Sequence, residues 1–158
     1  MAIGQISEAL FLLLIPVFFG RYGFKKTILV GMLAWAIRYV LFAYGNGSDL
    51  SFMLIIGIAL HGICYDFFFV SGQIYTNSKA GEKYKSAAQG LITLATYGIG
   101  MLIGFAVAGW ITDNYKTVDG GTNWQMVWII PAGIAFAVFL IFALFFDQKK
   151  EVKTTVTL

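Results

Sequence analysis

The chain has 158 residues, of which 59% are hydrophobic and 12% charged, and its formal net charge is +3. Soluble domains usually carry about 25% charged residues, so this composition excludes an ordinary soluble domain. The basic residues are divided among several short segments instead of forming one patch, which argues against nucleic-acid binding.

Five apolar stretches predict an all-α fold, a polytopic membrane helix bundle with five transmembrane helices. Each stretch is about as long as the ~20 residues that a helix needs to cross the hydrocarbon core, or longer. The apolar runs do not alternate with polar residues as barrel strands do, which favours helices over a β-barrel. The predicted helices span residues 3–20, 27–44, 50–75, 86–112 and 124–146. They form one bundle, residues 1–147, followed by a polar tail, residues 148–158.

The basic residues between the predicted helices indicate how the chain is oriented. Two of the loops hold only Lys116, whereas the other two loops and the tail hold nine basic residues. The positive-inside rule places the basic segments in the cytoplasm, so we expect the N-terminus outside and the C-terminus inside. The nine residues are Arg21, Lys25, Lys26, Lys79, Lys83, Lys85, Lys149, Lys150 and Lys153.

Three charged residues lie inside the predicted helices, namely Glu8, Arg38 and Asp66. Charges at membrane depth usually face the bundle interior or a water-filled cavity. A rise of 1.5 Å per residue places Glu8 roughly 8 Å and Arg38 roughly 9 Å below the outer boundary, so we expect an ion pair between them. This pair is compatible with a purely structural role. Asp66 lies deeper, roughly 22 Å from the outer face, and no basic residue of the chain matches its depth.

The stretch "HGICYDFFF", residues 61–69, holds the single histidine and the single cysteine. His61 and Tyr65 are four residues apart and share one helix face, and Gln5 and Glu8, three residues apart, share another. Rings, an amide and a carboxylate suit a flat, polar, uncharged ligand. Alternatively, Tyr65 and the phenylalanines only pack helices together and His61 is a satisfied polar residue. Spacing alone favours this packing interpretation over the ligand site.

Enzyme chemistry is poorly supported. His61 and Cys64 could form a pair on one helical turn, but no oxyanion hole or orienting acid accompanies them. One histidine and one cysteine also argue against a zinc site, and no phosphate-binding glycine loop occurs. We therefore expect neither catalytic residues, nor a metal, nor a cofactor.

Four motifs follow one another along the chain: "QISEALFLLLIPVFFGRYGFKK", "WAIRYVLFAYGNG", "HGICYDFFFVSGQIY" and "SAAQGLI". In this order they resemble the nucleoside–proton symporters of the major facilitator superfamily. The "RYGFKK" turn departs from the basic motif of the wider superfamily, because Gly20 stands where that motif usually has an aspartate. The resemblance covers nearly the whole chain.

The resemblance implies a fold of twelve spans in two halves, with this chain on spans eight to twelve. It implies secondary active transport across a bacterial inner membrane, with a nucleoside and protons as substrates. Transporters of this kind rock one half against the other around a midplane site. The N-terminal half is therefore an implied partner, and the chain alone is not expected to transport.

Carried over residue by residue, the resemblance implies that Gln5 and Glu8 bind the nucleoside ribose. It implies that His61 and Tyr65 face the nucleobase. Tyrosine or phenylalanine would be usual at both positions, so His61 puts the base preference in doubt and could add a hydrogen bond or pH sensitivity.

The resemblance also implies a buried charge network. Asp66 matches an acidic position beside the site, and Arg38 matches a basic residue on the following span. Either Asp66 or Glu8 is implied in proton coupling, since a carboxylate held away from water retains its proton more readily.

Two alternatives remain open from the sequence. The first is a symporter of the same superfamily that carries a sugar or another polar metabolite. The second is a stand-alone five-span assembly subunit. It would pack on a partner through Gly100 and Gly104, whose GxxxG spacing allows close approach of helices.

Overall fold

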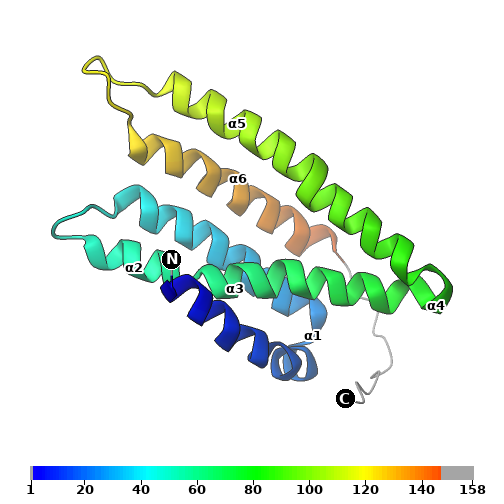
Figure 1. The fold of residues 1–158 in the computed structure, drawn as a ribbon. Helices are drawn as coiled ribbons and strands as arrows, with labels where there is room; N and C mark the ends of the chain where they lie inside the picture. Colours follow the sequence, from blue (N-terminus) through cyan, green and yellow to red (C-terminus); the bar gives the residue numbers. More distant parts are fainter. Residues whose placement is uncertain (1, 147–158) are drawn as a thin grey trace.

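A computed structural model of the chain describes residues 2–146, and the polar tail expected at 148–158 lies outside them. Within 2–146 every regular element is a helix, apart from an isolated antiparallel bridge between Lys116 and Thr122. The helices run alongside one another as long rods (Figure 1). In chain order they are α1 Ala2–Tyr44, α2 Ser51–Ala59, α3 His61–Tyr65, the π-helix η1 Asp66–Val70, α4 Ser71–Thr93, the π-helix η2 Leu94–Gly100, α5 Met101–Asn114 and α6 Trp124–Phe145.

The helices have the length and composition of membrane spans. Within the described residues three continuous helical stretches are long and apolar enough to cross a membrane: Ala2–Tyr44, Ser51–Asn114 and Trp124–Phe145. Most of their side chains are not buried inside the chain, as expected for helices that face lipid or another part of a larger bundle. The predicted all-helical membrane fold is confirmed, whereas helix assignment by itself yields three long stretches and not five separate helices.

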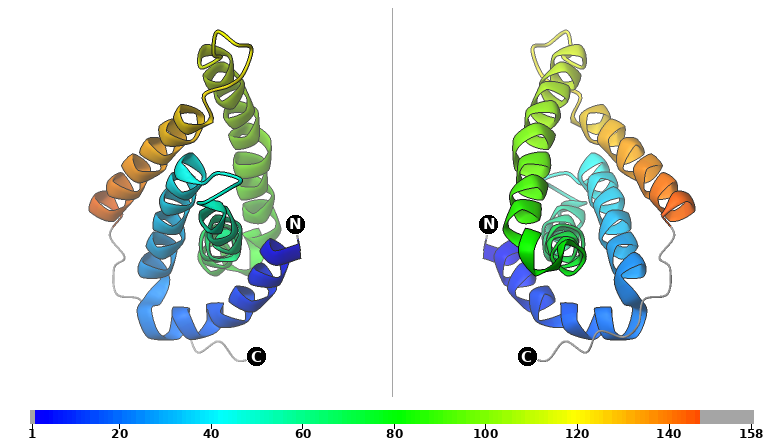
Figure 2. Two further views of the ribbon diagram at one scale, coloured as in Figure 1. Left: turned by 90° about the vertical axis from the view of Figure 1, so that its left-hand side faces the viewer. Right: turned by 90° about the vertical axis from the view of Figure 1, so that its right-hand side faces the viewer.

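Helix α1 reverses direction at Gly23, whose φ of 75° and ψ of 171° are not helical. Residues from both halves of α1 contact Phe67. The Phe18 ring lies 4.7 Å from the Phe67 ring, and a β-carbon added at Gly31 would lie 2.9 Å from the Phe67 carbonyl carbon. A straight helix would separate positions 18 and 31 by about 20 Å. Glycine tolerates positive φ, so the loop expected at 20–26 is replaced by a one-residue reversal (Figure 2).

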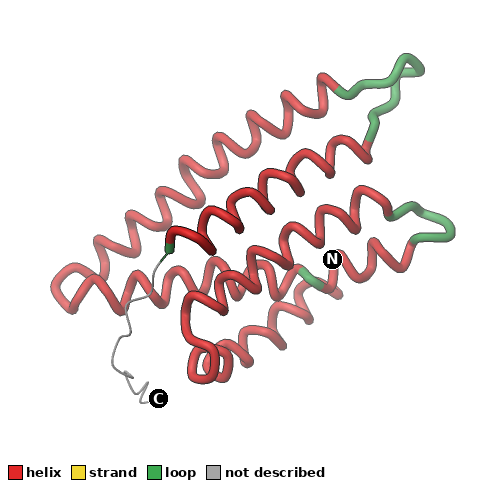
Figure 3. The backbone as a smooth tube through the Cα atoms, turned by 180° about the vertical axis from the view of Figure 1, so that it is seen from behind, coloured by secondary structure: helices red, strands yellow, loops and turns green. Residues whose placement is uncertain are grey.

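Helix α4 reverses in the same way at Gly81, which has a φ of 65° and a ψ of 163°. Gln89 Nε2 donates a hydrogen bond of 2.8 Å to the carbonyl oxygen of Gln73, although sixteen residues of straight helix would separate them by about 24 Å. Most of the loop expected at 76–85 is therefore helical. The tube in Figure 3 shows the helix path continuing on both sides of this reversal.

The best-buried apolar cluster lies on the second half of α1. Phe24, Ile28 and Met32 are each at most 7% exposed. The Phe24 ring stacks on Tyr75 of α4 with ring centroids 3.9 Å apart, and it also contacts Phe146 after α6. This cluster joins α1, α4 and the end of α6. The aromatic and apolar residues packed against it are Phe19, Phe68, Tyr75, Phe139, Phe142 and Phe146.

Helix α5 is the least covered part of the described chain. All residues from Met101 to Trp110 are exposed. Gly104 has no neighbouring atom within 4 Å of an added β-carbon, and Gly100 meets only Ala95 of its own helical stretch. The close packing that the GxxxG spacing allows is therefore not made within residues 2–146, and this face is available to lipid or to another chain segment.

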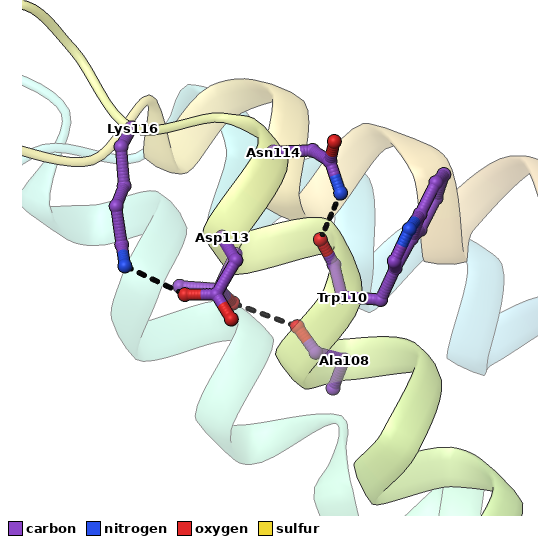
Figure 4. A network of polar contacts seen from close by, with 6 residues as sticks. Ala108, Trp110, Asp113, Asn114 and Lys116 are labelled. Carbon is purple, nitrogen blue, oxygen red and sulfur yellow. Dashed lines mark hydrogen bonds and ion pairs between the residues drawn. The ribbon is translucent and has the colours of Figure 1, made fainter.

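The turn after α5 is held by local polar contacts (Figure 4). Asn114 Nδ2 donates to the carbonyl oxygen of Trp110 at 2.8 Å, and Lys116 Nζ lies 2.6 Å from Asp113 Oδ1. The bridge between Lys116 and Thr122 then closes the loop, and Asn123 caps α6 by accepting a hydrogen bond from the Met126 amide. The loop therefore returns the chain directly into α6.

Candidate functional site

Three aromatic rings line up along the end of α3 and through η1. The ring centroids of His61 and Tyr65 are 5.9 Å apart, and those of Tyr65 and Phe69 are 5.3 Å apart. We call these three rings the aromatic column. The prediction that His61 and Tyr65 share one face is confirmed, and Phe69 extends that face by a further four residues.

Tyr97 of η2 completes this wall from a neighbouring helix. Its hydroxyl lies 2.6 Å from the Tyr65 hydroxyl, and its ring stacks on Phe69 with centroids 5.8 Å apart. Trp35 of α1 meets Phe69 from another side, with ring centroids 6.1 Å apart. The sequence does not predict the roles of Tyr97 and Trp35, because no local spacing connects residues that come from different helices.

Arg38 contacts His61 and not Glu8. Arg38 Nη1 lies 2.9 Å from His61 Nδ1, and its guanidinium carbon lies 5.1 Å from the centre of the Phe42 ring. No ion pair joins Glu8 to Arg38 in the described residues, so the expected pair is wrong. Similar depth in the membrane does not determine which way a side chain points around the helix axis. Instead, the charges of Glu8 and Arg38 both lie close enough to act on His61.

Glu8 belongs to the same cluster although it forms no hydrogen bond or ion pair within residues 2–146. It is half-buried, and its charge is close enough to act on His61, Tyr65 and Asp66. Gln5 is exposed and likewise has no polar partner in the described residues. Both side chains are thus free to bind a ligand.

Ser7 clamps the first half of α1 onto α3. Its hydroxyl donates to the carbonyl oxygen of Ala59 and accepts a hydrogen bond of 3.0 Å from the Gly62 amide. Gly4, one turn earlier, approaches His61, because an added β-carbon there would lie 3.7 Å from His61 Cβ. This tight packing places the face of Gln5 and Glu8 beside the aromatic column.

Asp66 is the most deeply buried charged residue of the cluster. It is 1% exposed, and neither of its carboxylate oxygens has a hydrogen-bond partner in the described residues. It opens η1, and π-helical turns occur frequently at functional sites. An unpaired buried carboxylate is energetically unfavourable as an anion, so the site favours a protonated Asp66 or a partner from outside residues 2–146.

A cavity of about 290 Å³ lies beyond Phe69, away from this polar cluster. Its lining is almost entirely apolar and includes Phe69 but none of Gln5, Glu8, His61 and Tyr65. A ligand with several hydroxyl groups needs polar partners, so the polar cluster is the better candidate site than the apolar cavity. The other lining residues are Ile28, Met32, Phe68, Gly72, Gln73, Ile92, Thr96, Val138 and Phe142.

Comparison with known proteins identifies the family. The family model described as "Nucleoside H+ symporter" matches residues 1–151.

The chain belongs to the nucleoside–proton symporter family.

Relatives of this chain agree with that assignment. It is 36% identical over 150 residues to the nucleoside permease NupG of Escherichia coli, and 35% identical over 150 residues to the xanthosine permease of the same organism. Each alignment covers 94% of this chain but only 36% and 35% of the relative, so the chain spans little more than a third of their length. These relatives are permeases and not enzymes, and the family expected from the sequence motifs is confirmed.

The chain also matches a solved structure. The crystal structure of the nucleoside transporter NupG superposes with a TM-score of 0.85 at 36% sequence identity. The match covers 94% of this chain and 37% of that chain. Together with the apolar helices, the match makes this chain a multi-pass membrane protein.

Proposed function

We propose that this chain is the C-terminal part of a transporter that imports nucleosides by proton symport. Its relatives carry the names nucleoside permease and xanthosine permease, and its family is named for nucleoside and proton. The observation that carries the proposal is the aromatic column with Glu8 and Asp66 beside it. This arrangement combines a flat apolar wall with hydroxyl-binding and protonatable groups.

The residue roles follow from the chemistry of a nucleoside. A base can stack on the rings of His61, Tyr65 and Phe69, as bases do on aromatic side chains elsewhere. The Glu8 carboxylate can accept hydrogen bonds from the ribose hydroxyl groups. The Gln5 amide can both donate hydrogen bonds to these hydroxyl groups and accept hydrogen bonds from them. These two side chains have no other polar partner within residues 2–146, so binding a ribose does not break a hydrogen bond within the described chain.

Asp66 is the better candidate for the group that carries the coupled proton, and Glu8 is the second. Asp66 is buried without a partner, so its protonation state decides whether a charge is present inside the bundle. Glu8 lies close enough for its charge to affect this proton. Arg38 is the basic residue of this network. It contacts His61 and does not form a direct ion pair with a carboxylate within residues 2–146.

We further propose that residues 1–147 form one bundle of five spans and that 148–158 form a cytoplasmic tail. The reversals at Gly23 and Gly81 support this count, because two of the three long helical stretches would each cross the membrane twice and the third, Trp124–Phe145, once. The positive-inside rule supports an outer N-terminus in a bacterial inner membrane. The N-terminal half of the transporter would supply the rest of the cavity.

The test is uptake of labelled uridine into vesicles by the complete transporter that contains this chain, with an inward proton gradient imposed. Uptake should collapse when the gradient is removed. Excess unlabelled uridine should compete, and unlabelled hexoses should not. Competition by hexoses would indicate that the transported substrate is a sugar and not a nucleoside.

Matched variants test the site within the same assay. Glu8→Gln and Tyr65→Ala should reduce uptake strongly without preventing membrane insertion. The controls are Glu82→Gln and Tyr84→Ala, which make the same substitutions at exposed positions. Normal uptake by both site variants would refute the assignment of the site.

A further inference from the structure

The contact between Arg38 and His61 determines which nitrogen of the imidazole carries the proton. Arg38 Nη1 lies 2.9 Å from His61 Nδ1. A guanidinium has only N–H donors and remains protonated, so Arg38 must be the donor. His61 Nδ1 is therefore the acceptor, and a neutral ring that accepts at Nδ1 carries its proton on Nε2.

The surrounding groups support the neutral form of His61. A second proton would have to sit on Nδ1, where it would oppose the Arg38 donor and place two positive charges side by side. Glu8 is the acidic group whose charge reaches His61, and it makes no hydrogen bond to the ring within residues 2–146. Tyr65 lies beside the ring on the same helix, and Cys64 also interacts with Arg38, while Arg38 Nη1 contacts His61 Nδ1.

The geometry points to His61 as a residue that selects nucleosides by the exocyclic group of the base. This inference rests on the proposed function. Nδ1 and Nε2 flank Cε1 and point outward in widely divergent directions, so the Nε2–H donor does not face Arg38. At the exocyclic position that distinguishes these bases, it pairs with the carbonyl oxygen of uridine or inosine and opposes the amino group of cytidine or adenosine.

The selection depends on His61 Nε2 remaining a hydrogen-bond donor and never becoming an acceptor. A tyrosine hydroxyl at this position would both donate and accept hydrogen bonds. It can therefore pair with either kind of base. His61 held by Arg38 can only donate from Nε2, so an amino group would leave two donors unpaired once the bound base covers the ring. Leaving a buried donor unpaired lowers affinity by about tenfold or more.

Competition against labelled uridine uptake by the complete transporter tests this inference. The inhibition constants of inosine and adenosine form one pair, and those of uridine and cytidine form the other. We expect the carbonyl member of each pair to bind about tenfold more tightly. His61→Phe removes the donor and should bring each ratio close to one. In His61→Gln the amide oxygen can accept from Arg38 and leave its N–H₂ as the outward donor, so this matched variant should keep the preference.

The outcomes separate the two proposals. No uptake of any nucleoside by an inserted, complete transporter would overturn the proposed function and this inference with it. Uptake with ratios near one, or ratios that His61→Phe leaves unchanged, would overturn this inference alone. If the His61 variants do not insert into the membrane, variants of Arg38 test the same inference. Arg38→Met frees both ring nitrogens and should lower the ratios several-fold, whereas Arg38→Lys keeps a donor and should preserve them. Unchanged ratios in Arg38→Met would refute the role of the contact.

Discussion

Replacing Gly62 with alanine should separate α3 from the first half of α1. A β-carbon at Gly62 would lie 2.5 Å from Ser7 Oγ and the Ser7 carbonyl carbon, and 2.6 Å from the Glu8 backbone nitrogen. Most of these atoms are backbone, and the hydroxyl is held by two hydrogen bonds, so neither can move aside alone. The two helices must shift apart, and Glu8 moves with α1.

The size of the effect follows from three contributions. Overpacking of a tight contact costs about 1–3 kcal/mol. Weakening the two hydrogen bonds of Ser7 costs about 0.5–1.5 kcal/mol each. Alanine is more favourable than glycine in a helix interior by about 1 kcal/mol, which opposes the other two contributions. The net destabilisation is about 1–5 kcal/mol.

Thermal unfolding of the complete protein in detergent, followed by tryptophan fluorescence, measures this destabilisation. Gly104→Ala is the matched control, because a β-carbon there meets no atom within 4 Å. At about 2–4 °C per kcal/mol, Gly62→Ala should lower Tm by several degrees, while the control should not lower it. Equal melting of the two variants would show that the contact at Gly62 does not hold the helices together. Uridine uptake should fall in the same variant, because the Glu8 carboxylate is displaced.

Three further predictions address other parts of the structure. Tyr65→Phe and Tyr97→Phe should each cost about 1 kcal/mol of stability through the hydroxyl pair, and the double variant should cost no more than either single one; additive losses would refute the pairing. Asp66→Asn should abolish the response of uridine uptake to the proton gradient while exchange of labelled for unlabelled uridine continues; persistent gradient-driven uptake would exclude Asp66 as the proton carrier. Gly81→Ala should destabilise the protein by about 1–2 kcal/mol because of the positive φ of Gly81. Gly90→Ala is the control, because an added β-carbon there meets no atom within 4 Å, and equal unfolding temperatures of the two variants would contradict the prediction.

The sequence predicts the helical membrane fold correctly because hydropathy depends only on composition within a window. It predicts the helix boundaries less well at two of the turns. The segments 20–26 and 76–85 contain basic and polar residues that suggest loops, yet each remains helical up to a single glycine. A reversal at one residue of positive φ needs no loop, and the sequence pattern does not show which glycine adopts it.

Only part of the candidate site could be predicted from local spacing. His61 and Tyr65 were paired correctly because four residues separate them on one helix. Tyr97 was missed and the partner of Arg38 was wrong, because contacts between helices depend on rotation about each helix axis. That rotation is set here by close packing, as at Gly31 against Phe67, which involves no motif.

The π-helical turn at η1 has a consequence for the alignment of the aromatic column. Four residues exceed one turn of an α-helix, which has 3.6 residues per turn, but fall short of one turn of the wider π-helix. The step from His61 to Tyr65 lies in α3 and the step to Phe69 crosses η1, so the two angular offsets oppose each other. A chain shorter by one residue within Asp66–Val70 would keep its hydropathy profile. A deletion before Phe69 would place its ring three residues after Tyr65 instead of four, which on an α-helix is about 60° away from the Tyr65 direction, so Phe69 would leave the line of the other two rings.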